Sequence, residues 1–111
     1  MLKVFTTKPD ELLEAINAGI ADGSIDTWVK TNSGSYTHST KSGQWKNLAW
    51  FRPSVSDGAI VFNIIRPKGA NVSTEVYAIY HGRFSEMLLG HFDEKLTVIR
   101  LTALPSEGDL V

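Results

Sequence analysis

Histidine is the residue type in this chain best suited to acid–base chemistry, because its side chain titrates near neutral pH. One of the three histidines lies in the segment Tyr80-His81-Gly82-Arg83. We interpret Gly82 as the point where a strand passes into the N-terminus of a helix. Open backbone N–H groups, the helix dipole and the Arg83 guanidinium would together favour an anion at this position.

A second histidine, His38, belongs to a basic segment and could lie opposite His81. The pair could then act as base and acid in the cleavage of a phosphodiester without a metal, with Arg83 or Lys41 stabilising the charged transition state. A small metal-independent enzyme acting on a phosphodiester or nucleotide is therefore our alternative prediction. Its catalytic residues would be His38, His81 and Arg83.

A structural interpretation of the same residues competes with the catalytic one. In that interpretation Gly82 permits a turn and His81 makes a hydrogen bond within the fold. Arg83 pairs with one of two nearby carboxylates, Glu75 or Glu86. The third histidine, His91, is expected on the buried side of a short helix, where it would be packed and hydrogen-bonded.

Metal and thiol chemistry find no support in the residue pattern. The chain has 111 residues and no cysteine, which excludes disulfides, thiolate zinc sites and cysteine nucleophiles. No two histidines lie at the spacing that places both on one face of a helix or strand. Glycine-rich phosphate loops, nucleophile elbows and calcium loops are also absent from the sequence. We therefore expect no metal and no cofactor, and we favour a protein that is not an enzyme.

Charge is unevenly distributed along the chain, although 11 basic and 12 acidic residues give a net charge of -1. Residues 1–27 and 70–111 are acidic. Residues 28–69 carry six basic side chains against Asp57 alone, and they hold all three tryptophans. Cations interleaved with flat aromatic groups suit a single-stranded nucleic acid, because phosphates need positive charge and bases need a stacking surface. The same residue types also suit an acidic protein partner.

The favoured prediction is therefore a non-catalytic binding module that uses a basic, aromatic sheet surface. Its partner would be another protein or a single-stranded nucleic acid, and the sequence leaves these two open. The predicted binding residues are Trp28, Lys30, Tyr36, His38, Lys46, Trp50 and Arg52. The prediction requires at least one exposed tryptophan, whereas the competing interpretation places these aromatics in the core. Two further hypotheses are a homodimer that forms through an edge strand and a structural subunit of a larger assembly.

The elements that position these residues follow from the hydropathy pattern. An N-terminal strand is predicted over residues 2–6. The segment Thr7-Lys8-Pro9-Asp10 then indicates a helix start with a threonine N-cap. Leu12, Ile16 and Ile20 form an apolar stripe at four-residue spacing, so the helix runs to about residue 21. Gly23 is the expected helix stop.

From residue 27 the helical period disappears and turn signals recur, which indicates antiparallel strands. The predicted strands cover residues 27–31, 35–40, 44–52, 59–66 and 74–81. Residues 59–66 are apolar on nearly both faces and are expected at the centre of the sheet, whereas 27–31 and 35–40 are expected at an edge. After Gly82, apolar residues at three- and four-residue steps predict a second short helix, followed by a strand over 96–104.

These elements predict an α+β fold: a single domain over residues 1–104, with a mainly antiparallel sheet of five to six strands and two helices packed on one face. Residues 105–111 form a polar C-terminal tail that we expect to fray. No apolar run approaches the roughly 20 residues of a transmembrane helix, and no signal peptide is recognisable. We therefore expect a cytoplasmic protein with no membrane partner.

Overall fold

Six short strands, two α-helices and one short 3-10 helix are present in the part of the chain that the structure describes. The computed structural model describes residues 1–39 and 43–111. In chain order the elements are β1 (Leu2–Phe5), α1 (Pro9–Asp22), β2 (Trp28–Lys30), β3 (Tyr36–His38), β4 (Trp50–Ser56), β5 (Ala59–Ile65), α2 (Thr74–Phe92), the short 3-10 helix η1 (Asp93–Lys95) and β6 (Val98–Leu101). The strands form one antiparallel sheet in the order β2-β3-β4-β5-β1-β6, which confirms the predicted α+β class.

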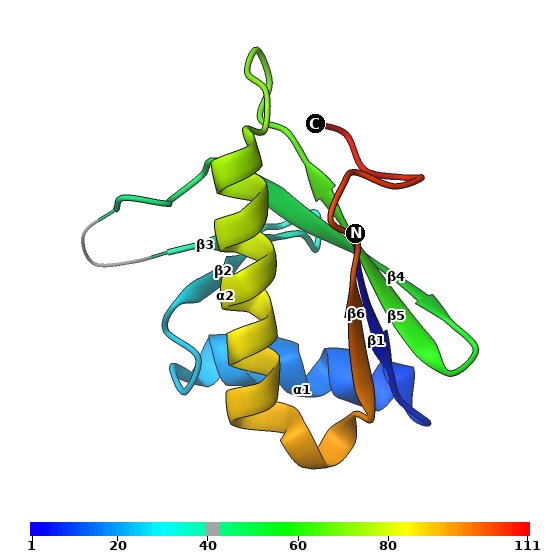
Figure 1. Cartoon of the computed structure of the whole chain (residues 1–111). Coiled ribbons are helices and arrows are strands. Elements are labelled where there is room, and N and C mark those ends of the chain that lie inside the picture. Colours follow the sequence, from blue (N-terminus) through cyan, green and yellow to red (C-terminus); the bar gives the residue numbers. More distant parts are fainter. Residues whose placement is uncertain (40–42) are drawn as a thin grey trace.

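Both helices cover the same face of the sheet, and the core lies between them and the strands. Leu2 pairs with Phe62 and Val4 with Ile60, and all four side chains are fully buried. The helices add apolar side chains to the same cluster, among them Leu12, Ile16, Tyr80, Phe84 and Leu88. Each large apolar side chain buried in this way contributes roughly 1.5–3 kcal/mol. Figure 1 shows the two helices crossing, with the turn of the β4–β5 hairpin projecting away from α2.

The other face of the sheet, which we call the open face, is not covered by either helix. Side chains alternate between the two faces of a strand, so the residues next to the buried ones along each strand define this face. Trp50 of β4 pairs with Ile65 of β5, and Lys3 of β1 pairs with Val61 and with Arg100 of β6. The open face consists of Lys3, Phe5, Trp50, Arg52, Ser54, Val61, Asn63, Ile65, Val98 and Arg100.

Aromatic rings from the sheet and from α2 fill the centre of the core. Phe84 lies 4.8 Å from Trp28, 4.9 Å from Phe51 and 4.8 Å from Phe62, measured between ring centroids. Tyr36 also contacts Phe84, and its hydroxyl donates to Asn17 Oδ1 of α1. Edge-to-face and tilted ring pairs of this kind add roughly 0.5–1.5 kcal/mol each beyond their buried area. The aromatic residues of the basic segment are therefore mostly core residues.

The strand predicted over residues 74–81 is wrong, because these residues form the first half of α2. The helix begins after Ser73, whose hydroxyl accepts a hydrogen bond from the Val76 N–H at 3.1 Å. It continues through Gly82, where a glycine costs roughly 1 kcal/mol relative to alanine but does not end the helix. Tyr77, Tyr80, His81, Phe84 and Leu88 are all buried and recur at helical spacing. Packing against the sheet outweighs the local strand preference of the aromatic and β-branched residues.

Smaller differences concern the ends of other elements. The threonine N-cap is wrong: α1 begins at Pro9 with Lys8 at the cap position, and Thr6 Oγ1 accepts from the Lys8 N–H. Gly23 ends α1 as predicted, in the left-handed conformation with φ 85. Residues 44–47 form a turn, so the strand predicted from residue 44 begins only at Trp50. Lys41, which we considered as a cation for the transition state, lies outside the described residues.

Strand positions agree with most of the predictions. β5 lies in the interior of the sheet between β4 and β1, and β2 is an edge strand, as expected. β3 is not an edge strand, because it lies between β2 and β4. The second edge is β6, where Val98 and Leu101 are exposed. No helix in the described part of the chain has the length and apolarity needed to cross a membrane.

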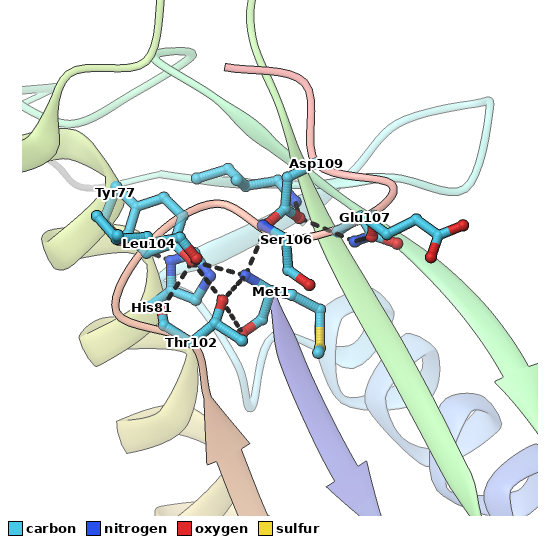
Figure 2. Close-up of polar contacts among 10 residues, drawn as sticks. Met1, Tyr77, His81, Thr102, Leu104, Ser106, Glu107 and Asp109 are labelled. Carbon is cyan, nitrogen blue, oxygen red and sulfur yellow. Dashed lines mark hydrogen bonds and ion pairs between the residues drawn. The ribbon is translucent and has the colours of Figure 1, made fainter.

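The C-terminal tail is held against the sheet, which corrects the expectation that it frays. The Leu110 N–H donates to the Ile64 carbonyl at 2.9 Å, and the Arg66 N–H donates to the Leu110 carbonyl. The Asp109 carboxylate accepts from the Met1 ammonium at 2.9 Å and from Asn63 Nδ2 at 2.8 Å. Figure 2 shows that Tyr77 and Thr102 oxygens complete the cluster around this ammonium group.

Candidate functional site

The histidines predicted as acid and base are both core residues. His81 lies in the middle of α2, not at a helix N-terminus, so the anion site predicted there is wrong. Its ring stacks on Tyr77 with a centroid distance of 3.9 Å, and Nδ1 lies 2.7 Å from the Tyr77 carbonyl oxygen. The structural interpretation of His81, a hydrogen bond within the fold, is confirmed. The ring also contacts Phe51 of the sheet edge-on.

Burial also sets the protonation of these two rings. Loss of solvation lowers the pKa of His81 to about 4, although the Tyr77 carbonyl acts in the opposite direction. Burial, followed by the charge of Arg83, lowers the pKa of His38 as well. His38 lies against Trp28 and Tyr80 in the core. Neutral buried rings cannot reach a substrate or donate a proton to it at neutral pH, so the catalytic pair has no support in this geometry.

Arg83 and the third histidine lie on the surface. Arg83 Nη1 lies 4.0 Å from Glu86 Oε1 one helical turn away, which confirms one of the two predicted ion pairs. Both partners are more than half exposed, so the pair contributes little to stability. His91 is exposed near the C-terminal end of α2, so its predicted buried position is wrong. The reason is that the apolar face of α2 runs through Leu88 and Phe92 instead.

Most of the predicted binding residues do not share one surface. Trp28, Tyr36 and His38 are at most 2% exposed and face the helices, so they cannot form part of a binding surface. Lys30 is exposed, but it pairs with Tyr36 and so lies on the helix-covered side of β2. Lys46 lies in the turn at 44–47. The Tyr80 hydroxyl donates to the Trp45 carbonyl of this turn and accepts from the Leu48 N–H that follows it. Trp50 and Arg52 remain, and they share the open face.

A groove of about 400 Å³ lies beside these two residues. Trp50 and Arg52 of β4 and Ile65 of β5 form its floor, since all three lie on the open face. The Trp50 side chain is half-buried and Arg52 is exposed. The opposite wall is the turn between β2 and β3, from which it takes Thr31, Ser33 and Ser35. We call these six residues the Trp50 groove.

Hydrogen bonds hold the hydroxyl wall of the Trp50 groove in place. The Thr31 N–H donates to the Ser35 carbonyl at 2.8 Å, and the Ser35 N–H donates to Thr31 Oγ1 at 3.1 Å. The Thr31 and Ser33 hydroxyl oxygens lie 2.9 Å apart. Gly34 allows the turn, because its φ of 87 lies in the left-handed region. Hydroxyl groups donate and accept, so this wall can bond to polar groups of either kind.

The Arg52 guanidinium has no carboxylate partner among residues 1–39 and 43–111. Ion pairs within 4.0 Å in the described residues join Met1 to Asp109, Lys8 to Glu11 and Arg83 to Glu86. An arginine without an acid beside it presents a fork of N–H donors that fits a phosphate or a carboxylate. The Trp50 groove therefore combines a stacking surface, an anion-binding cation and neutral hydrogen-bonding groups.

A second cavity, of about 320 Å³, lies at the start of α1. Its lining includes Lys8, Glu11, Glu94 and Lys95, so charges of both signs are present. Lys8 and Glu11 lie 3.9 Å apart and offset each other. No group of three or more histidine, aspartate or glutamate side chains within the described ranges could hold a metal ion. The Trp50 groove is therefore the better candidate site.

None of the protein-family models, curated proteins or solved structures compared with this chain matches it. The function must therefore be argued from the groove itself. Sequence reasoning identified Trp50 and Arg52 through the coincidence of aromatic and basic residues. It missed Thr31, Ser33, Ser35 and Ile65, because Asn32-Ser33-Gly34 signals a turn without showing which strand the turn will face.

Proposed function

We propose that this protein is a non-catalytic module that binds single-stranded nucleic acid through the Trp50 groove. The observation that carries the proposal is that Trp50 and Arg52, two residues apart, lie on the same face of β4. A base stacked on the indole would place its phosphate group within reach of a guanidinium that no carboxylate neutralises. Stacking of this kind contributes roughly 1–3 kcal/mol per base.

The hydroxyl wall favours a nucleic acid over an acidic protein. Bases and sugars carry donors and acceptors close together, and the Ser33 and Ser35 hydroxyls offer both kinds of partner over one short turn, while the Thr31 hydroxyl already donates to the Ser35 carbonyl. A stable protein interface buries roughly 800 Å² on each partner around an apolar centre that is depleted of charge. Trp50 and Ile65 are the apolar groups of the groove floor, and Arg52 of β4 lies beside them. A nucleic acid is therefore the favoured partner, and an acidic protein is the competing one.

A single strand is also favoured over a duplex. The net charge of the chain is -1, so the attraction for nucleic acid must be local. Duplex binding without base contacts depends on many phosphate contacts along both strands. In a single strand the bases are unpaired and can stack on an aromatic side chain, and a few phosphate contacts then suffice.

The test is tryptophan fluorescence during titration with a mixed-sequence single-stranded RNA of 12 nucleotides at about 50 mM and about 200 mM salt. The same titration uses single-stranded DNA of that sequence, its duplex, and polyglutamate as an acidic polypeptide. We expect quenching by the single strands that weakens at the higher salt, and no quenching in Trp50→Phe, which keeps a ring but removes the reporter. Quenching by polyglutamate alone would replace the nucleic acid with an acidic protein partner.

A matched pair of variants separates the groove from general charge. Arg52→Gln removes the cation on the groove floor, and Lys30→Gln removes one from the helix-covered side of the sheet. Both side chains are exposed, so both variants should fold. Binding weakened equally by the two variants, or by neither, would contradict the proposed site.

A further inference from the structure

Lys3 and Arg100 lie directly opposite each other on the open face. They are register partners across β1 and β6, and Arg100 is exposed. Like charges in this position repel each other and destabilise a strand pair. No carboxylate in the described residues lies within 4.0 Å of either side chain. Two positive charges are therefore held together without an internal counter-ion.

Both cations lie close to the ring of Phe5. Lys3 Nζ lies 5.2 Å from the ring centroid, and Arg100 Cζ lies 5.1 Å from it. The electron-rich face of an aromatic ring attracts a cation at such distances. This attraction places the two charged groups but leaves their charge unneutralised. An oxyanion that approaches the open face would meet an ammonium and a guanidinium at one position.

From this arrangement we infer a second phosphate-binding position, formed by Lys3 and Arg100 and positioned by Phe5. The inference rests on the proposed function and extends it, because the ligand is the same single-stranded nucleic acid. Arg52 and Arg100 belong to β4 and β6, which are separated by three strand spacings of about 4.8 Å each. The backbone of the bound strand would cross β5 at Val61 and then β1 to reach the Lys3–Arg100 pair, because residues 107–109 lie against the Asn63 side chain.

The two positions predict how affinity depends on ligand length. A dinucleotide can occupy the Trp50 groove but cannot also reach the Lys3–Arg100 pair. An oligomer of eight nucleotides can reach both, since small domains cover roughly 4 to 16 nucleotides of a single strand. Each phosphate contact adds about 0.7 to the negative slope of log affinity against log salt.

The experiment measures the affinity of a dinucleotide and of an eight-nucleotide RNA for four proteins: the parent chain, Arg100→Gln, Arg100→Lys and Arg52→Gln. We expect Arg100→Gln to weaken the eight-nucleotide RNA about three- to tenfold and to lower its salt slope by about 0.7, with the dinucleotide unchanged. Arg100→Lys should retain most of the affinity, because it keeps the charge. Arg52→Gln should weaken both ligands.

Thermal unfolding separates this effect from misfolding. Arg100→Gln removes both the repulsion from Lys3 and the attraction to the Phe5 ring at an exposed position, so its melting temperature should change little. An Arg100→Gln variant that binds both ligands like the parent, while Arg52→Gln does not, would overturn the second position and leave the proposed function standing. If neither ligand binds the parent chain, both the inference and the proposed function fail.

Discussion

Trp50 and Ile65 are cross-strand partners on the face of the sheet that neither helix covers. Their neighbours Phe51 and Ile64 are also partners, and these side chains are fully buried beneath the helices. A one-residue change of register would exchange the two pairs and bury the indole. The pairing of β4 with β5 therefore determines which of these aromatic side chains can reach a ligand.

Replacing Trp50 by alanine should weaken binding of single-stranded RNA about 5- to 150-fold, because the indole supplies the stacking surface. Trp50→Phe should retain part of the affinity, since a smaller ring still stacks. Fluorescence anisotropy of a labelled RNA measures both variants without depending on tryptophan emission. Equal loss of affinity in Trp50→Ala and Trp50→Phe would argue against stacking.

The affinity of Arg52→Gln should depend less steeply on salt than that of the parent chain. The guanidinium is expected to contact one phosphate, and loss of one contact reduces the salt slope for a single strand by about 0.7. Isothermal titration at several salt concentrations gives this slope. Lys30→Gln is the matched control, and an identical slope change in that variant would remove Arg52 from the site.

Asp109→Asn should destabilise the fold by about 1–3 kcal/mol, because the variant leaves the Met1 ammonium without its counter-ion. The Asp109 side chain is fully buried, and its carboxylate also accepts from the Ile64 and Ser106 N–H groups. Burial raises the pKa of this carboxyl, but the hydrogen bonds from Ser106 and Asn63 and the Met1 ammonium outweigh burial and keep the pKa below its ordinary value. Denaturant unfolding at neutral pH measures the change.

Glu107→Gln provides the control for that variant. Glu107 is an exposed neighbour, and it takes part in the cluster only through its backbone carbonyl, which accepts from Asn63. Its replacement should change stability by less than about 0.5 kcal/mol. If Asp109→Asn is as stable as Glu107→Gln, the tail does not depend on the ion pair with Met1.

Stability should decrease as the pH falls from about 6.5 towards about 4. The pKa of His81 is about 4 in the folded state against an ordinary value of 6.5, so the unfolded chain binds the proton first in this window. Above pH 6.5 the contribution of the neutral His81 ring to the free energy of unfolding is fully present. As the pH falls to about 4, on the order of 3 kcal/mol of this contribution is lost. His38 acts in the same direction, because its pKa is also lowered. Asp109 acts only at lower pH, below its ordinary 3.8.

Denaturant unfolding between pH 4 and 7.5 tests this account. His81→Leu should show a smaller change in unfolding free energy over the window than the parent chain does. His91→Gln is the control for a histidine substitution at an exposed position. An unchanged pH dependence in His81→Leu would mean that the buried ring does not titrate as its surroundings indicate.

The sequence predicted the sheet and α1 well because their signals are local. Leu12 and Ile16 repeat at helical spacing, and both are buried on the face that meets the sheet. The first half of α2 was misassigned because Val76, Tyr77 and Tyr80 favour strands locally. Their helical period becomes decisive only when it is followed across Gly82 to Phe84, which packs on Trp28 and Phe62.

The candidate site was only partly predictable, because its walls come from separate parts of the chain. Trp50 and Arg52 stand out as an aromatic next to a cation, but Trp28 and Tyr36 show the same local pattern and are buried. Strand register decides between these two outcomes, and register depends on contacts across the whole sheet. The hydroxyl wall and the Lys3–Arg100 pair likewise follow from strand order.

The most direct test of the central claim follows the three indole N–H signals in a nitrogen–proton correlation spectrum during titration with a mixed single-stranded RNA. If RNA binds in the Trp50 groove, the signal of Trp50 shifts progressively. The signal of Trp28, which is 2% exposed beneath α2, does not shift. Trp50→Phe assigns the resonance. A Trp50 signal that stays unchanged at saturating RNA would contradict the proposed groove.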